Sequence, residues 1–397
     1  MLRIIEAMLV KGGCFVKAIV NGTLYTVAQG IIENGTILIQ DGKIVALGAN
    51  LPIPEEAEII FAEGAHIYPG LIDADCKVGI FEEGQGPIGD DTNEAGSIGS
   101  ELRAFDATWW EDVAFEDCRR AGITALSIGP GSNNVINGQS FVTKTAPGVL
   151  DHQVIRAYAG LKINICGTRG NQGDRTIDIA LLQGQLQKAK ELMAKNAKLI
   201  EKGETPEENP KQDPLVALLK GENFARITVY ANHDILNALE LAKTWGFPLV
   251  LERCYEGHLV VDDIVASGCK VIAGPTFVNR YGAAKNLSLK MPGVLAKAGV
   301  AVALCSDHPT LPSENLSTQA ALACRDGLPE ELALRAITLT AAEILGVADR
   351  IGSLEVGKDA DLAIFSEPIF KTASQCLATM VNGTLIWQAE EEGECQC

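Results

Sequence analysis

Residues 67–350 alternate short apolar runs with segments of helical character, and this alternation constrains the fold more than any other feature. For example, the apolar run at 225–230 precedes a helical stretch at 233–246. Strands that alternate with helices of about 10–15 residues form βαβ units and a parallel sheet. About eight such units over ~280 residues predict a (β/α)8 TIM barrel. An open doubly wound sheet is the alternative.

Both ends of the chain have a different texture, in which β-branched runs are separated by Asn-Gly or Asp-Gly pairs. These pairs are Asn21-Gly22, Asn34-Gly35, Asp41-Gly42 and Asn382-Gly383. Such pairs favour the two-residue turns of β-hairpins. We therefore predict a small β-sandwich domain built from both chain termini, residues 1–66 and 351–397, around a barrel of residues 67–350.

The composition excludes several classes of function. A formal net charge of −18 argues against nucleic-acid binding and against docking on an anionic membrane, because both need a basic face. No run reaches the ~18 apolar residues of a membrane span. The eleven cysteines are scattered through predicted strands and helices, as expected of free thiols in a reducing compartment. We predict a cytoplasmic protein that binds a small molecule, and we leave a homo-oligomer open.

Three motifs give the chain a family resemblance. They are Pro69-Gly70-Leu71-Ile72-Asp73, Ser306-Asp307-His308-Pro309, and the segment GSLEVGKDADLAIF at 352–365. Together with the split β domain they resemble the amidohydrolase superfamily, most closely its imidazolonepropionase-like branch. The resemblance covers nearly the whole chain. It implies a hydrolase that acts on C–N bonds other than peptide bonds, with a metal centre at the carboxyl ends of the barrel strands.

The resemblance also implies where the metal ligands would stand, and most of them are replaced. The family carries His-x-His on the first strand and one His each on the fifth and sixth. The corresponding residues here are Asp75, Lys77, Tyr230 (or Thr228 in a shifted register) and Arg253. The aspartate of the eighth strand is retained as Asp307, the candidate catalytic residue. Lys162 stands at the position of the bridging ligand.

Two interpretations of this substituted site remain. Protonated Lys and Arg cannot bind a metal ion, so Lys77 and Arg253 are expected to form ion pairs with Asp307 and Asp75, without any cofactor. Alternatively, the residues Asp75, His233, His258 and Asp307 form a site for one divalent metal ion such as zinc. Candidate substrate contacts are Asn134, Gln139, His258 and His308.

Two functions follow from these interpretations. The first is a hydrolase of non-peptide C–N bonds, for which metal-dependent activity is in doubt. The second is a non-catalytic relative that binds a small anion or serves as an assembly subunit. Metal content per chain would discriminate between them.

Overall fold

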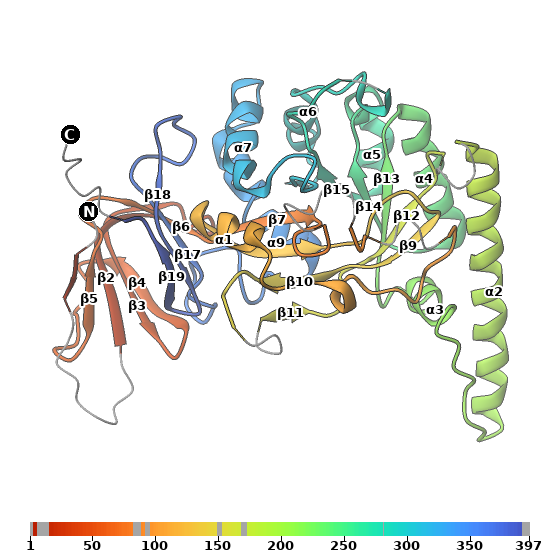
Figure 1. Cartoon of the computed structure of the whole chain (residues 1–397), viewed down its shortest axis with the longest axis horizontal. Coiled ribbons are helices and arrows are strands. Elements are labelled where there is room, and N and C mark those ends of the chain that lie inside the picture. Colours follow the sequence, from red (N-terminus) through yellow and green to blue (C-terminus); the bar gives the residue numbers. More distant parts are fainter. Residues whose placement is uncertain are drawn as a thin grey trace.

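The computed structural model describes residues 3–5, 16–81, 89–91, 96–148, 153–167, 173–280 and 282–390. The predicted β domain, residues 1–66 and 351–397, includes residues 1–2, 6–15 and 391–397, which lie outside these ranges. Figure 1 shows a sheet region that contains both ends of the chain and, beside it, a larger region of strands and helices. None of the helices in the described ranges combines the length and the hydrophobicity that crossing a bilayer requires.

The sheet beside the two termini is assembled from both ends of the sequence. Strand β17 pairs antiparallel with β6, with Leu362 opposite Pro69, and so joins the C-terminal strands to the N-terminal ones. Its core contains Ile19, Leu24 and Ile67. The nine strands of this sheet are β1 (Arg3–Ile5), β2 (Val16–Tyr25), β3 (Ile31–Gln40), β4 (Lys43–Ala49), β5 (Glu58–Phe61), β6 (His66–Pro69), β17 (Leu362–Phe365), β18 (Cys376–Val381) and β19 (Thr384–Gln388).

Two of the four predicted hairpin turns are present. Asp41-Gly42 joins β3 to β4, and Asn382-Gly383 joins β18 to β19. All four of these residues have positive φ, between 48° and 75°, as a type I′ turn requires.

The prediction was wrong for Gly22 and Gly35. These glycines lie inside β2 and β3, directly opposite each other in the ladder. A Cβ atom on Gly22 would come within 2.5 Å of Ile67, and one on Gly35 would clash with Leu24. Close packing, and not a turn, explains both glycines.

The second region is a layer of parallel strands surrounded by helices (Figure 1). Adjacent strands β12 to β16 pair in parallel, as do β7 and β8. The parallel strands are β7 (Leu71–Cys76), β8 (Ile123–Ile128), β12 (Leu161–Asn164), β13 (Ala225–Val229), β14 (Leu249–Arg253), β15 (Lys270–Ala273) and β16 (Val302–Leu304). The helices are α1 (Val113–Arg120), α2 (Arg175–Glu201), α3 (Asp213–Leu219), α4 (Asn232–Trp245), α5 (Val261–Ser267), α6 (Met291–Lys297), α7 (Leu316–Arg325), α8 (Glu330–Ala336) and α9 (Leu339–Leu345).

One position departs from the repeat of parallel βα units. Strands β9 (Ile136–Gln139) and β10 (Phe141–Lys144) follow one another, and both run antiparallel to their neighbours, β9 to β12 and β10 to β8. Strand β11 (Val154–Arg156) then pairs with β10. No helix occurs between β8 and β12 in the described residues. Residues 129–139 therefore follow β8, the second strand of this region, and end in β9, which with β10 takes the third strand position and is antiparallel.

The carboxyl ends of β7 and β16 are joined by backbone hydrogen bonds. The N–H of Asp307 donates to the carbonyl oxygen of Asp75 (2.9 Å), and the N–H of Lys77 donates to that of His308 (3.1 Å). The residues that follow these two strands are therefore held side by side. The free cysteines of the described ranges include Cys166, Cys254, Cys269, Cys305 and Cys324.

Candidate functional site

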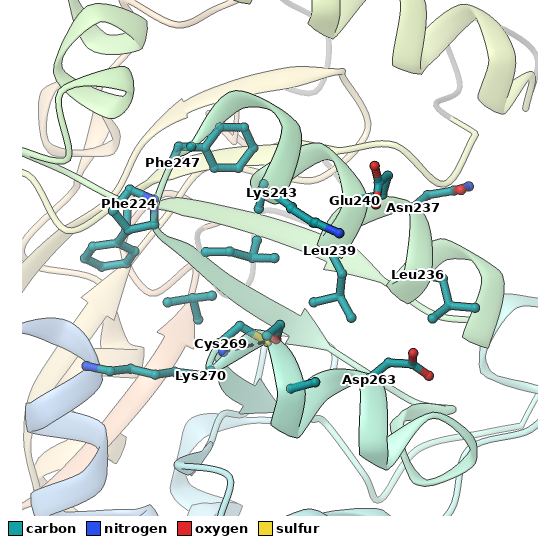
Figure 2. Close-up of a pocket in the computed structure, with 18 of the residues that line it drawn as sticks. Phe224, Leu236, Asn237, Leu239, Glu240, Lys243, Phe247, Asp263, Cys269 and Lys270 are labelled. Carbon is teal, nitrogen blue, oxygen red and sulfur yellow. Dashed lines mark hydrogen bonds between the residues drawn. The ribbon is translucent and has the colours of Figure 1, made fainter.

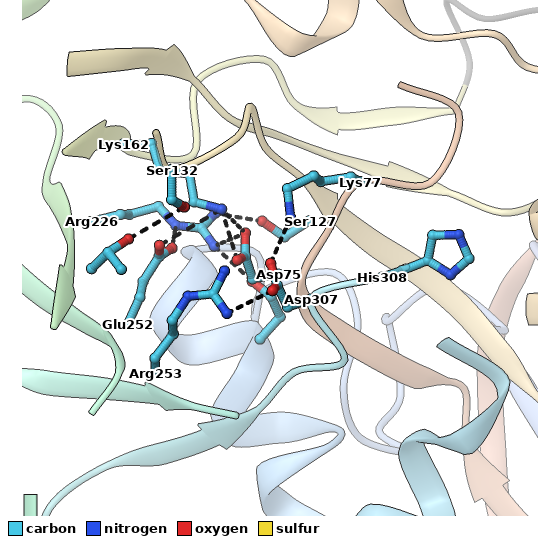
Figure 3. A network of polar contacts seen from close by, with 12 residues as sticks. Asp75, Lys77, Ser127, Ser132, Lys162, Arg226, Glu252, Arg253, Asp307 and His308 are labelled. Atoms are coloured by element: carbon cyan, nitrogen blue, oxygen red, sulfur yellow. Dashed lines mark hydrogen bonds and ion pairs between the residues drawn. The ribbon is translucent and has the colours of Figure 1, made fainter. Parts of the chain in front are cut away.

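The site is a buried cluster of ion pairs at the carboxyl ends of the parallel strands (Figure 3). Its upper layer centres on Asp307, which follows β16. One carboxylate oxygen of Asp307 accepts from Lys77 Nζ at 2.7 Å, and the other lies 2.6 Å from Arg253 Nη1. The hydroxyl of Thr310 also donates to Asp307, at 2.9 Å. The two ion pairs expected for Asp307 are thus both present.

A deeper layer centres on Asp75. Lys162 Nζ lies 2.8 Å from both carboxylate oxygens of Asp75, and Arg226 Nη2 donates to one of them at 2.9 Å. Arg226 also pairs with Glu252 at 2.5 Å, and Lys162 lies 3.7 Å from the same glutamate. These side chains are at most 4 % exposed. Each charge in this layer therefore has an opposite charge beside it, which is the condition under which buried charges are tolerated.

Local backbone structure aims these side chains inward. Lys162 and Arg226 are direct neighbours in the β12–β13 ladder. In β7, the register with β8 shifts between Asp73 and Cys76, and such irregularities redirect a side chain. The carboxylate of Asp73 has separate partners, accepting from the backbone N–H of Ser306 at 3.0 Å. Burial raises the pKa of Asp73 to about 6, against these hydrogen bonds.

The ion pairs shift the pKa values of the upper layer. Burial by itself would raise the pKa of Asp307, but Arg253 and Lys77 outweigh it and hold that pKa well below its usual range. Burial would lower the pKa of Lys77 and of Arg253, but Asp307 outweighs it and raises both. All three side chains therefore stay charged at neutral pH.

The cluster contains more positive than negative groups. Its cations are Lys77, Lys162, Arg226 and Arg253, and its carboxylates are Asp75, Glu252 and Asp307. Among the described residues, four cations against three carboxylates leave one positive charge in excess. The least buried members are Lys77 and Arg253, whose side chains are 9 % and 12 % exposed. The excess charge therefore lies toward the open side of the cluster.

The backbone is strained at the same residues. Arg253 has φ 65°, Cys254 φ 51° and Asp307 φ 49°. Most other non-glycine residues with positive φ in the described ranges are Asn or Asp, which adopt this region readily. Strain of this kind gathers at functional sites, where the surrounding structure enforces it. Of the two residues in the Arg253–Asp307 ion pair, Arg253 is the one whose residue type rarely adopts positive φ.

Two tyrosines flank Arg253. Its guanidinium carbon lies 5.7 Å from the centre of the Tyr230 ring, and the rings of Tyr230 and Tyr255 are 5.6 Å apart. Burial raises the pKa of both phenols, against the opposing effect of Arg253. Tyr230 is therefore a neutral aromatic wall beside the cation and not a phenolate ligand.

The residues present do not fit the binuclear metal centre that the fold family implies. Both oxygens of Asp75 and both oxygens of Asp307 already bind cationic side chains. Two ammonium groups and two guanidinium groups would repel a divalent ion in this volume. Within the described ranges, no group of three or more His, Cys, Asp or Glu side chains is arranged to hold a metal ion.

The structure does not assemble the alternative mononuclear site. The side chain of His233, on α4, is 57 % exposed and lies 3.3 Å from Asp234, not from Asp75 or Asp307. His258 lies in a short 3-10 helix, Gly257–Leu259, and its Nδ1 has no hydrogen-bond partner in the described part of the chain. The expected grouping of Asp75, His233, His258 and Asp307 was therefore wrong in its two histidines.

The other candidate contacts have structural partners. His308 is buried, its Nδ1 accepts from the backbone N–H of Ser313 at 3.4 Å, and its ring points away from the cluster (Figure 3). Burial lowers its pKa to about 4, with a further lowering from Lys77. The side-chain amide of Gln139 donates to the carbonyl oxygen of Ser100 at 3.1 Å. The backbone of Asn134 is held by the Asn137 side chain.

Arg226 and Glu252 were missed because sequence reasoning considered only residues at the ends of strands. The available signal was a charged residue within a mostly apolar run, Arg226 in ARITV (225–229) and Glu252, followed by Arg253, in LVLER (249–253). Alternate residues of a barrel strand point inward. A charged residue there must meet an opposite charge inside the barrel.

The largest cavity described lies away from this cluster (Figure 2). Its volume is about 1110 Å³, and its walls come from α4, α5 and the amino-terminal ends of β14 and β15. Phe247 and Cys269 contribute to its lining, and Lys243 and Glu240 lie at its edge. No residue of the ion-pair cluster lines it.

Comparison with known proteins supplies the family. The model of the amidohydrolase family matches residues 283–386, which include Asp307. The crystal structure of an amidohydrolase from Thermotoga maritima superposes with a TM-score of 0.90 at 29% identity, covering 94% of this chain and all of that one. Over most of its length the chain is thus similar to members of the amidohydrolase superfamily. Its architecture is accordingly a TIM-barrel-like α/β fold.

Curated members of the superfamily match along most of the chain. Amidohydrolase tasK of Hapsidospora irregularis is 24% identical over 88% of this chain, which spans only 39% of that protein. The imidazolonepropionase of Sphingopyxis alaskensis is 25% identical over 87% of this chain and 90% of its own length. The chain therefore spans most of the length of the imidazolonepropionase but well under half of tasK.

Proposed function

We propose that this amidohydrolase-superfamily protein, from the imidazolonepropionase-like branch, has lost metal-dependent hydrolysis and binds a small anion at the mouth of its barrel. The supporting observation is the ion-pair cluster, whose cations include Lys77 and Arg253, two of the positions to which the family resemblance assigns metal ligands. The substituted positions are Asp75, Lys77, Tyr230 and Arg253. Asp307 then organises cations and does not hold a metal.

The charge excess identifies the class of ligand. A carboxylate or phosphate would neutralise the extra positive charge, and the guanidinium of Arg253 suits two-point recognition of such groups. Arg253 pairs with Asp307 through Nη1 and also hydrogen-bonds Tyr255, and because a guanidinium carries five N–H groups, others can serve a ligand. The Tyr230 ring beside it adds an apolar wall.

We also infer the finer architecture from this family reading. The eight strand positions from β7 to β16, with β9 and β10 sharing the third, would close as a barrel through the backbone contacts between β16 and β7. The terminal sheet would fold over as a β-sandwich. The proposed boundaries remain residues 1–66 and 351–397 for the β domain and 67–350 for the barrel.

Titration calorimetry with acetate and with inorganic phosphate tests the proposal. We expect binding by the wild-type protein, a loss of about tenfold or more in affinity for Arg253→Met and Lys77→Met, and no change for His233→Ala, a matched exposed control. Absence of binding to the wild-type protein, or equal binding by Arg253→Met, would overturn it.

A hydrolase of non-peptide C–N bonds is the second candidate. Similarity to imidazolonepropionase over 87% of this chain favours it. Such an enzyme would have to activate water without the binuclear centre. Hydrolysis of a cyclic or linear amide that persists after chelation, and is lost in Asp307→Asn, would favour this candidate over anion binding.

A further inference from the structure

We propose a second ligand site, for an organic cation with an apolar body, in the cavity between the terminal sheet and α8. This cavity has a volume of about 670 Å³, within the usual range for small-molecule sites. Its walls come from β2, β6, α8 and the segment 368–371. No member of the ion-pair cluster lines it, so the site is independent of the proposed function.

Aromatic rings form one wall. Tyr25 and Tyr68 stack with ring centres 4.3 Å apart and an angle of 19° between their planes. The Tyr68 ring is fixed, because its hydroxyl accepts from the backbone N–H of Ile369 at 3.1 Å and Phe365 packs against its edge. Tyr25 is only partly buried, and its hydroxyl lies 3.1 Å from His66 Nδ1. The wall is thus rigid and built before any ligand arrives.

The turn between β2 and β3 adjoins the cavity, and its backbone is strained at one residue. Val27 has φ 69°, a genuine outlier for a β-branched residue. The turn is fastened on either side of it, since the Thr26 hydroxyl donates to the carbonyl oxygen of Gly30 at 2.8 Å and accepts from the N–H of Gln29. Val27 and Ile31 line the cavity, and Ile31 is 58 % exposed. An exposed apolar side chain at a strained turn points to a binding function.

Charge at the rim selects a cation. Glu330 and Glu331 line the cavity and are exposed, and in the part of the chain that the structure describes neither makes an ion pair. The basic residue of the lining, Lys371, is already paired with Glu367 at 2.7 Å. The rim is therefore net negative beside the partly exposed ring of Tyr25, behind which the buried Tyr68 stacks, and this combination attracts an ammonium group.

Calorimetry with phenethylammonium tests the site, with phenethyl alcohol as the neutral probe of the same shape. We expect phenethylammonium to bind at least about tenfold more tightly than the alcohol. The double variant Glu330→Gln/Glu331→Gln should abolish this preference, whereas Glu204→Gln, an exposed loop control, should keep it. The variant Leu334→Trp should block both probes by filling the cavity.

Three results would overturn the proposal. They are no binding of phenethylammonium to the wild-type protein, equal affinity for the two probes, or unchanged binding by Leu334→Trp with a native circular dichroism spectrum. Failure of acetate binding at the barrel mouth would leave this site unaffected, because the probes and the variants differ.

Discussion

The described part of the chain contains two buried ion clusters, at opposite ends of the parallel strands, and they balance charge differently. At the amino-terminal end, Lys144 Nζ pairs with Asp359 at 2.8 Å and Asp361 at 2.9 Å, and it also contacts Asn382. The further cations on Asp359 are Lys43 and Arg350, whose side chains are 46 % and 38 % exposed. Solvent therefore helps to balance this base cluster.

At the mouth, by contrast, the excess charge is buried. The four cations there are at most 12 % exposed, and Arg253 and Asp307 also carry strained backbone conformations. The base cluster joins the terminal sheet to the barrel, since Asp359 and Asp361 immediately precede β17 and Lys144 ends β10. The comparison teaches that a buried ion cluster whose charges are balanced serves to stabilise the structure. A buried cluster with an excess of positive charge is instead suited to bind an anionic ligand.

The largest effect is expected from Arg226→Met. This substitution leaves Glu252 without its closest cation and removes one partner of Asp75, both fully buried, so the free energy of unfolding should fall by about 3–5 kcal/mol. The matched change at the base, Lys43→Met, removes a half-exposed partner and should cost less than about 1 kcal/mol. Denaturant unfolding followed by circular dichroism measures both. Equal losses would break the comparison.

An intermediate effect is expected from Lys144→Met. Asp359 keeps Lys43 and Arg350, whereas Asp361 loses the only ion pair that it makes with the described residues. The expected loss is about 1–3 kcal/mol in the same unfolding assay. A loss larger than that of Arg226→Met would show that the base cluster, and not the mouth, depends more on its buried cation.

A smaller effect sharpens the charge argument. Asp307→Asn should raise the excess at the mouth from one positive charge to two, and so strengthen acetate binding about fivefold. Asp359→Asn makes the same change at the base and should leave acetate affinity unaltered. Weaker acetate binding by Asp307→Asn would mean that Asp307 positions Lys77 and Arg253 and that their charge is not what binds the ligand.

The smallest effect concerns acid stability. Burial by itself would raise the pKa of Asp359, but hydrogen bonds from Lys144 and Lys43 outweigh burial and lower that pKa to about 2. A carboxyl whose folded-state pKa is depressed stabilises the fold above its unfolded pKa of about 4, and that contribution is lost as the pH falls toward 2. Asp359→Asn should therefore unfold with a shallower dependence on pH between 4 and 2. An unchanged slope would contradict the assignment.

Sequence reasoning found the upper layer of the mouth but not the deeper one. Strand ends of parallel units meet at one edge, so Lys77 and Arg253 could be placed beside Asp307 from their positions alone. Arg226 and Glu252 lie inside strands, where pairing depends on the inward alternation and on which strands are neighbours. Gly22 and Gly35 were misassigned because an Asn-Gly pair is a local signal, whereas close packing against Ile67 and Leu24 is a long-range one.

The antiparallel direction of β9 and β10, which share the third strand position, also could not be predicted from the sequence. The segment FVTK at 141–144 has ordinary strand composition, whereas INGQ at 136–139 does not, and only the pairing of β10 with β8 and of β9 with β12 reveals their direction. The chain reverses at the loop that follows β8, so a hairpin-like connection replaces the helix of a βα unit. Hydrophobic periodicity does not encode strand direction.

The central claim is that an ion-pair cluster occupies the place of the metal centre, and elemental analysis tests it most directly. The protein would be produced in medium supplemented with zinc, manganese and iron, purified without chelator, and its bound metal measured per chain. The account predicts far less than one metal ion per chain. One tightly held ion per chain, removed by a chelator together with any amide hydrolysis, would contradict it.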